Sequence, residues 1–451
     1  MEKERVFTLE TRLNKEQFKY FEEYIIFYNK VYREVWQDCI HGEILDSKYK
    51  IDMSIKYNLL RRTINSIVQD VKGKYKTLKA LQKQQCKQLE FKINAIDKDI
   101  KELKGEIAIL HPFVEKNELD EPKLIQYRNK KGRLFALQKK KLKYKNKIDI
   151  LKVKNRLSFG SKKFWMKQYN LGSNGFKTYI SWYNQYLKKR DKYIYYIGSS
   201  DEKCGNSMFQ LTYDKILDSF HCKVRKEKRY TCKGDKYIYF DINFKALRRD
   251  VLIKMLETNK SITYRVLRRD KKWYLQAIFS ASFNIITNKS NGCLGVDFNN
   301  GFLAVTETDT NGNIKSSKII ELKYHGLGNK AKTEMEKVVK NLVKYCKLRK
   351  KALVIEDLNF NKKKSGVLSS KRNKRGKHYN QMIHSLDYTR FSELSNNSSI
   401  INGVEFIKVN SAYTSQIAKQ KYCEQRKLNS HIGAAYIIAR RGQGYIDKLV
   451  A

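Results

Sequence analysis

Two acidic residues end short apolar segments in the last third of the sequence. Asp297 closes the apolar part of "GCLGVDFNN", and Glu356 closes that of "KALVIED". His431 follows at the start of a predicted helix, "NSHIGAAYIIARRG". Two-metal phosphoryl transfer needs carboxylates from different elements around two Mg²⁺ ions ~3.5–4 Å apart. Asp297, Glu356 and His431 are therefore candidate catalytic residues and metal ligands, although each alone is a weak signal.

The segments around these residues predict how they are positioned. From Gly292 the sequence indicates a strand, a turn at 299–301 and a second strand, so Asp297 projects from a central strand of a hairpin. Residues 351–357 form a nearly continuous apolar run that suits a buried parallel strand, and an amphipathic helix over 334–346 precedes it. Asn429 or Ser430 caps the last helix, whose small residues allow close packing on a sheet.

The net charge predicts a polyanionic partner. The chain has 94 Lys and Arg against 46 Asp and Glu, a formal charge of +48 over 451 residues. No long apolar run or signal pattern is present, so we expect no membrane association and favour nucleic acid. The eight cysteines include no C-x-x-C pair, so we expect a reducing cytoplasm, no disulfide framework and no zinc site.

The first two thirds of the chain divide into a helical and a strand-rich part. Apolar residues spaced three and four apart predict an antiparallel helical hairpin over 93–110 and 124–151, with a polar turn bracketed by Pro112 and Pro122. Its lysine-rich faces suit either a phosphate backbone or solvent. The helix predicted over 15–40 has an aromatic stripe that suits a core. From about 193 the period becomes two, which predicts strands, and the strand near 5–13 is expected to join their sheet.

Four segments resemble the transposon-encoded TnpB family and the type V CRISPR effectors related to it. They are "GVDFNNGFLAV", "LVIEDLNF", "VNSAYTSQ" and "HIGAAYIIARRG". The resemblance covers about 292–444 and implies a RuvC-like RNase H fold in which Asp297 and Glu356 are catalytic. The family's third acid falls on His431, which departs from the pattern. Imidazole can ligate a divalent metal, so either retained or impaired activity follows.

The resemblance in plan implies the fold class: multidomain α+β, with a β-rich wedge domain, an inserted helical recognition domain and a C-terminal RuvC-like α/β domain. The expected boundaries are 1–14 for the first wedge strand, 15–157 for the recognition domain, 158–290 for the rest of the wedge and 291–451 for the nuclease domain. A basic loop at 361–381 suits either a lid over the active site or a surface loop. The candidate nucleic-acid-binding residues are Lys362, Lys363, Lys364, Lys371, Arg372, Lys374, Arg375, Lys377, Arg440 and Arg441.

These observations together predict an RNA-guided DNA endonuclease that uses Mg²⁺, with Mn²⁺ as a substitute. Its expected partners are a guide RNA and double-stranded target DNA, and the general division of labour is that pairing supplies sequence specificity. We expect a prokaryotic, cytoplasmic, nucleoid-associated protein, with a monomer favoured. Three alternatives remain open: a nuclease-impaired guided repressor, a guide-free RNase H-fold nuclease or transposase, and a structural RNA-binding protein.

Overall fold

The computed structural model describes residues 2–449 except 117, 119, 154–158, 232–233, 246–247, 270–271, 300, 325–327 and 359–387. Its chain forms two compact units that both contain helices and strands, so the protein is a multidomain α+β molecule. Unit 1 comprises Met1–Arg5, Gln85–Asp149 and Ser282–Ala451, and unit 2 comprises Val6–Gln84 and Ile150–Ala281. No helix within these described stretches is long and apolar enough to cross a membrane.

A four-stranded sheet, built mainly from unit 2, brings the start of the chain beside its middle. Its strands, in order across the sheet, are β1 (Glu2–Leu13), β7 (Lys272–Asn284), β6 (Ile262–Arg269) and β2 (Tyr193–Tyr196). β6 pairs antiparallel with both β7 and β2. Buried and more exposed residues alternate along β7, because successive side chains of a strand point to opposite faces. The first strand therefore occupies one edge of this sheet.

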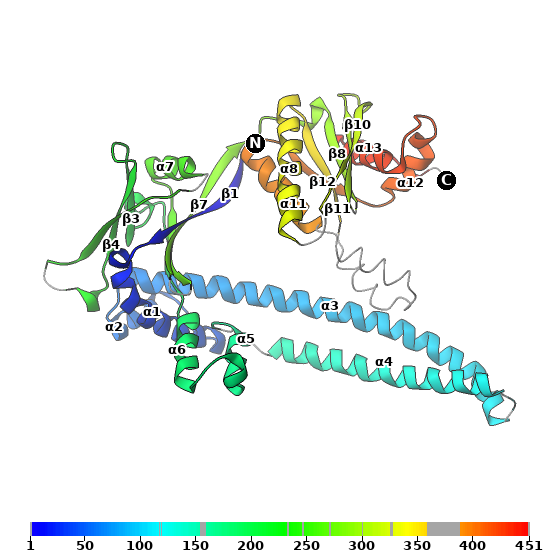
Figure 1. Ribbon diagram of the computed structural model, residues 1–451, viewed down its shortest axis with the longest axis horizontal. Helices are drawn as coiled ribbons and strands as arrows, with labels where there is room; N and C mark the ends of the chain where they lie inside the picture. The colour runs from blue at the N-terminus through cyan, green and yellow to red at the C-terminus, as the bar shows by residue number, and fades with distance from the viewer. Residues whose placement is uncertain are drawn as a thin grey trace. The chain divides into compact units, whose positions relative to one another are not determined.

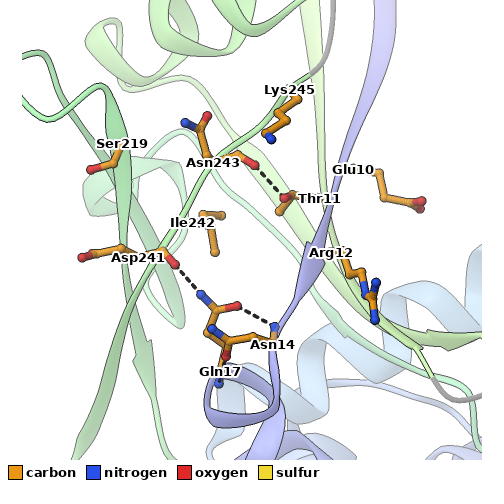
Figure 2. A pocket seen from close by; sticks show the side chains of 10 residues that line it. All are labelled: Glu10, Thr11, Arg12, Asn14, Gln17, Ser219, Asp241, Ile242, Asn243 and Lys245. Carbon is orange, nitrogen blue, oxygen red and sulfur yellow. Dashed lines mark hydrogen bonds between the residues drawn. The ribbon is translucent and has the colours of Figure 1, made fainter.

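A second, three-stranded antiparallel sheet lies in unit 2. Its strands are β3 (Phe209–Asp214), β4 (Ser219–Arg225) and β5 (Tyr237–Ile242), and helix α7 (Arg249–Glu257) follows them. Figure 2 shows how it is tied to the end of β1: the Thr11 hydroxyl donates to the carbonyl of Asn243 over 2.6 Å, and the Gln17 amide donates to that of Asp241. A polar cavity of about 680 Å³ lies between these contacts.

Helix α1 (Lys15–His41) supplies much of the core of unit 2. Asn14 and Gln17 form a capping box at its start, and Gly42, at φ 92°, ends it in the left-handed conformation. The aromatic stripe is buried, which confirms that it belongs to the core; its members are Phe21, Tyr24, Tyr28, Tyr32 and Trp36. A shorter helix, α2 (Ser47–Tyr57), follows.

Two long helices, α3 (Arg61–Glu115) and α4 (Glu121–Val153), form the predicted hairpin (Figure 1). Lys130 forms an ion pair with Glu106, and Lys141 forms one with Asp97. Residues later in α4 thus contact residues earlier in α3, so the two helices are antiparallel. One expectation is wrong: Pro112 does not end the first helix. The N–H of Lys116 donates to the carbonyl of Pro112, so the last turn closes beyond the proline.

A small aromatic cluster precedes β2 in unit 2. It is built on α5 (Lys162–Trp165), two 3₁₀ turns (Met166–Tyr169 and Gly172–Asn174) and α6 (Tyr179–Arg190). Trp182 is fully buried against Phe164 and Phe176, and its indole N–H donates to the carbonyl of Phe164 over 3.1 Å. This packing holds the N-terminal half of α6 against α5.

The described C-terminal part of unit 1 contains a five-stranded sheet. Its strands, in order across the sheet, are β10 (Ile314–Glu321), β9 (Phe302–Thr308), β8 (Cys293–Asn299), β11 (Ala352–Asp357) and β12 (Phe406–Asn410). β8 and β9 form the predicted antiparallel hairpin, and β11 lies parallel to both β8 and β12. The prediction of a buried parallel strand at 351–357 is therefore confirmed, since every residue of β11 before Asp357 is buried.

Helices cover both faces of this sheet (Figure 1). The covering helices are α8 (Asn329–Arg349), α11 (Tyr388–Asn402), α12 (Thr414–Ala418) and α13 (Ser430–Gln443), and a short π-helical turn, Lys419–Cys423, follows α12. On one face Leu294 and Val296 pack with α8 and α11; on the other Cys293 and Val354 pack with α13. The sheet is thus the middle layer of three, and its two faces have separate cores.

Candidate active site

Asp297 and Glu356 project toward the same face of the five-stranded sheet. Side chains alternate along a strand, and Cys293 on β8 and Val354 on β11 both pack against α13. Asp297 lies four residues after Cys293, and Glu356 lies two after Val354, so both acids share the face of α13. The expectation that the two strand-end acids come from different elements agrees with this arrangement, and the structure places those elements side by side.

The register of β8 and β11 brings the two acids level with each other. Val296 pairs with Ile355 in the parallel ladder, and each acid is the next residue along its strand. Neighbouring strands lie roughly 4.7–4.9 Å apart, so the two carboxylates leave the sheet from adjacent backbone positions. Both are buried, with 8% of Asp297 and 7% of Glu356 exposed.

Two side chains contact Asp297, and both reach the same oxygen. The amide of Asn299 donates to Oδ2 over 2.9 Å, and Nδ1 of His431 lies 3.5 Å from that atom. Among the described residues no donor contacts Oδ1. Burial raises the pKa of Asp297, and its contacts with Asn299 and His431 oppose that shift. Desolvation is therefore the dominant influence on this pKa.

Glu356 is held by a residue from the segment after β12. The Thr414 hydroxyl donates to Oε1 of Glu356 over 2.7 Å, and Thr414 is itself buried at the first position of α12. The hydroxyl of Tyr388 donates to the backbone carbonyl of Glu356. These contacts orient the carboxylate and the end of β11.

His431 lies in the first turn of α13, where the sequence predicts it. The side chain of Asn429, the N-cap, accepts from the backbone N–H of His431 over 2.8 Å. The imidazole is partly exposed and its ring meets that of Phe302 edge-on, with centroids 5.1 Å apart. A cavity of about 400 Å³, lined in part by Phe302 and Asn429, opens beside it.

Small residues bring α13 close to β8. A Cβ atom added at Gly295 would lie 2.2 Å from the carbonyl oxygen of Ala435 and 2.5 Å from the nitrogen of Ala439. The hydroxyl of Thr306 on β9 also donates to the carbonyl of Ile432 over 3.1 Å. The expectation that small residues allow close packing is confirmed, and this packing places His431 beside Asp297.

The donor set fits a hard cation in part. Two carboxylates on adjacent strands supply the oxygen ligands that Mg²⁺ prefers. Within the described part of the chain, however, no three His, Cys, Asp or Glu side chains are grouped so that they could hold a metal ion. The pair Asp297 and Glu356 is thus better supported as a metal-binding group than the full set with His431.

The predicted nucleic-acid-binding residues divide into two groups. The lysines and arginines of 361–381 lie outside the described residues. Arg440 pairs with Asp447 over 2.9 Å and donates to the carbonyl of Gly312, while Arg441 donates to the carbonyl of Ala412. Arg440 is mostly buried in these contacts, so its guanidinium supports the fold around α13.

Sequence reasoning missed Asn299 and Thr414 as partners of the two acids. Asn299 lies two residues after Asp297, so strand alternation alone could have placed it on the same face. Thr414 is 58 residues from Glu356, and no spacing connects the two. Its segment, "VNSAYTSQ", nevertheless belongs to the motifs that carry the family resemblance.

No protein-family model and no curated protein matches this sequence. Solved structures do resemble the chain. One is a Cas12f1–sgRNA–target DNA complex, with a TM-score of 0.38 and 12% identity over 97% of this chain and 99% of the other. Another is a Cas12i–crRNA–dsDNA complex, with a TM-score of 0.23 and 10% identity. A third is a Cas12i1 R-loop complex after target DNA cleavage, with a TM-score of 0.22 and 12% identity.

These are type V CRISPR effectors. The four sequence segments quoted above resemble the same group of proteins. The chain spans 60% and 49% of the two Cas12i chains. Because the TM-scores are below 0.5, the argument for function rests on the residues of the site.

Proposed function

We propose that the protein is an RNA-guided DNA endonuclease whose described C-terminal sheet is a RuvC-like RNase H fold. The observation that carries the proposal is the pair of buried acids, Asp297 and Glu356, at adjacent ends of two parallel strands. The sheet order β10-β9-β8-β11-β12, with an antiparallel hairpin followed by parallel strands, supports it. The formal charge of +48 supports a polyanionic substrate.

The chain's own residues have distinct roles in this proposal. Asp297 and Glu356 hold the metal through their carboxylate oxygens. Asn299 and His431 orient Asp297 by contacting Oδ2, and Thr414 orients Glu356. When bound, Mg²⁺ at such a site lowers the pKa of water and stabilises the negative charge on the leaving oxygen. The raised pKa of Asp297 means that a bound cation also keeps this carboxylate ionised.

The remaining regions take the roles that the family resemblance implies. We assign the wedge to 1–14 and 158–290, the recognition domain to 15–157 and the nuclease domain to 291–451. The lysine-rich hairpin of α3 and α4 suits contact with a phosphate backbone, because its exposed faces carry many cations. Guide RNA and double-stranded target DNA are the proposed partners, and Mg²⁺ is the proposed cofactor.

The test is to purify the protein from its native host or with its genomic neighbourhood and to sequence the RNA that it carries. The recovered ribonucleoprotein is then incubated with matched and mismatched DNA, with Mg²⁺ or with a chelator. We expect one defined RNA and cleavage of matched DNA only when Mg²⁺ is present. RNA-free protein that binds DNA sequence-specifically would contradict the guided mechanism.

A second candidate is a nuclease-impaired guided DNA-binding protein. His431 stands where the resembled family has its third acid, and among the described residues three metal ligands are not grouped. In that case the ribonucleoprotein binds matched DNA without cutting it. Cleavage that appears only in the His431→Asp variant would identify an impaired site.

A further inference from the structure

A basic pocket in unit 2 contains none of the candidate site residues named above. It has a volume of about 670 Å³ and is lined by three elements: Ser161 before α5, the C-terminal end of α6, and the end of β6. Its cationic lining residues are Lys188, Lys189, Lys192, Arg268 and Arg269. Its described lining residues include no acid. Pockets of roughly 300–1,000 Å³ hold a drug-sized ligand, so this one is large enough for a nucleotide unit.

The pairing of β2 with β6 fixes the two sides of this pocket. The N–H of Arg268 donates to the carbonyl of Lys192 over 2.8 Å, which holds these residues side by side. The guanidinium of Arg268 also lies 3.3 Å from the carbonyl of Asp191. Lys188 lies in the last turn of α6 and adds its charge from the helix. The cations therefore come from separate elements that the fold brings together.

The nearby carboxylates leave most of this charge uncompensated. Arg269 forms a bidentate pair with Glu10, over 2.8 and 2.7 Å. The buried Asp191 carboxylate forms ion pairs with Arg190 and Arg33. Within the described parts of the chain, Lys188, Lys189, Lys192 and Arg268 form no ion pair. Four cations thus line one cavity without an ion pair to any described residue, although Glu22 and Asp191 partly compensate the charge of Arg268.

The protein satisfies the guanidinium of Arg268 only in part: one of its terminal nitrogens donates to the carbonyls of Lys188 and Asp191. The Arg268 side chain is half-buried, and its Nε is buried without a hydrogen-bond partner among the described residues. Burial is the largest influence on its pKa and lowers it, which means that the protein alone does not fully compensate its charge. A guanidinium presents several donors in a planar fork that matches phosphate oxygens.

A structural explanation accounts for only part of the cluster. Lysines in the last turn of a helix are favourable, because the C-terminal end of a helix carries partial negative charge. That effect explains Lys188 and Lys189 on α6. It does not explain Lys192 and Arg268, which lie outside the helix and add like charge to the same cavity.

We infer that this pocket binds a phosphate-bearing nucleotide of the RNA that the protein holds. The inference rests on the proposed function, because it takes a guide RNA as the lasting partner. Clustered cations without counterions repel one another and destabilise the free protein, so an occupant that stays bound is favoured. In the proposed mechanism the guide remains bound throughout, whereas target DNA enters and leaves.

The test compares two double variants of the full chain after removal of copurified RNA. Lys188→Ala/Lys192→Ala removes two pocket charges. Lys228→Ala/Lys254→Ala removes the same charge from exposed lysines of unit 2 that do not line the pocket. The probes are a fluorescent 20-nucleotide RNA and DNA of the same sequence. Binding is measured over a range of salt concentrations.

For RNA we expect weaker binding by the pocket variant and a smaller salt dependence. The slope of log affinity against log salt should fall by roughly 0.7 for each lost phosphate contact, so by ~1.4 for the pair. The control variant should keep the wild-type slope, and the pocket variant should keep the wild-type slope with DNA. An RNA slope equal to that of wild type would overturn the inference, and an equal loss with DNA would overturn the assignment to RNA.

Failure here is distinguishable from failure of the proposed function. A protein that carries a defined RNA and cuts matched DNA, but whose pocket variant binds RNA as the control does, keeps its function and loses this pocket. A protein without guided cleavage loses the proposed function, while the measured slopes still decide whether the pocket takes RNA.

Discussion

Buried carboxylates occur in both units, and they differ in how their oxygens are used. Glu227 in unit 2 is 0% exposed and accepts hydrogen bonds from Tyr24, Thr63 and the backbone N–H of Leu60, which together reach both of its oxygens. Asp297 in unit 1 has two contacts, both at Oδ2. Burial raises the pKa of each acid. A raised pKa alone therefore does not identify a functional acid, whereas the distribution of donors separates the two.

The comparison gives each acid a different role. Glu227 lies in the segment after β4 and ties it to two helices: Tyr24 donates from α1, Thr63 donates from α3 and Leu60 immediately precedes α3. The backbone N–H of Glu227 also donates to the hydroxyl of Tyr20. Asp297 contacts the side chains of Asn299 and His431 through one oxygen and leaves the other without a described donor. We propose that Glu227 stabilises the fold and that Asp297 binds a ligand.

The largest expected effect is on cleavage by the Asp297→Ala variant. A metal at such a site supplies several kcal/mol of transition-state stabilisation, and each ~1.4 kcal/mol is a factor of ten, so we expect a loss of roughly 10³-fold or more. Stability should change by no more than about 1 kcal/mol, because removing the carboxylate also removes its desolvation cost. Guided DNA binding, measured in parallel, should stay near wild type. Unchanged cleavage would show that Asp297 is not a catalytic residue.

Removing Glu227 should lower the stability of the protein and leave its cleavage activity unchanged. Glu227→Ala leaves the donors of Tyr24, Thr63 and Leu60 without their partner, and each buried unsatisfied group costs about 1–3 kcal/mol. We expect a loss of ~3 kcal/mol or more in the free energy of unfolding, measured in urea. Cleavage per folded molecule should be unchanged. If this variant is as stable as wild type, the contrast between the two acids fails.

Variants of His431 test how much the contact between its imidazole and Asp297 contributes to cleavage. Residues that orient a ligand typically cost 10–100-fold when removed, so His431→Ala should lower cleavage by about that factor. His431→Asp should retain or raise cleavage, because Mg²⁺ prefers carboxylate to imidazole. Cleavage rates with Mg²⁺ at fixed pH compare the variants. A fully active His431→Ala would direct the search for a third ligand elsewhere, although Asp447 is already paired with Arg440 and Tyr422.

The smallest expected effect is a change of stability with pH. Because the folded pKa of Glu227 is raised, the folded protein holds this proton above ~4.3, the unfolded value, where the unfolded chain has lost it. The stability that Glu227 contributes is therefore complete below that pH and is lost as pH rises through the folded pKa. Glu227→Gln should remove this part of the pH dependence. Urea unfolding of both proteins from pH 4 upward tests it, and parallel curves would contradict it.

Local patterns predicted the elements better than their limits. The hairpin helices follow from apolar spacing, but α3 begins at Arg61, well before the expected start near 93. Ile64, Ile67, Val68 and Val71 are buried at helical spacing, so the signal was present in the sequence. Pro112 failed as a boundary because a proline in a final helical turn removes one hydrogen bond without preventing the next one.

The acids of the site were predictable, but their surroundings were not. Asp297 and Glu356 stand at strand ends that composition reveals, and strand alternation gives their face. The contact of Thr414 with Glu356 depends on the path of the chain after β12, which no local pattern encodes. The basic pocket likewise depends on the pairing of β2 with β6. Its four cations without an ion pair among the described residues have no distinctive sequence spacing and line one cavity only in the folded chain.

The division of the chain into two discontinuous units affects the order of folding during synthesis. Unit 2 is complete once residue 281 has emerged from the ribosome, whereas unit 1 also requires the segment that contains α13. At ~5–20 residues per second, that delay is on the order of ten seconds or more. Until α13 covers Gly295, the strand that carries Asp297 lacks one of its packing layers. The proposed cutting centre is thus assembled after the proposed RNA-binding pocket, so under this proposal a nascent chain binds RNA before it can cut DNA.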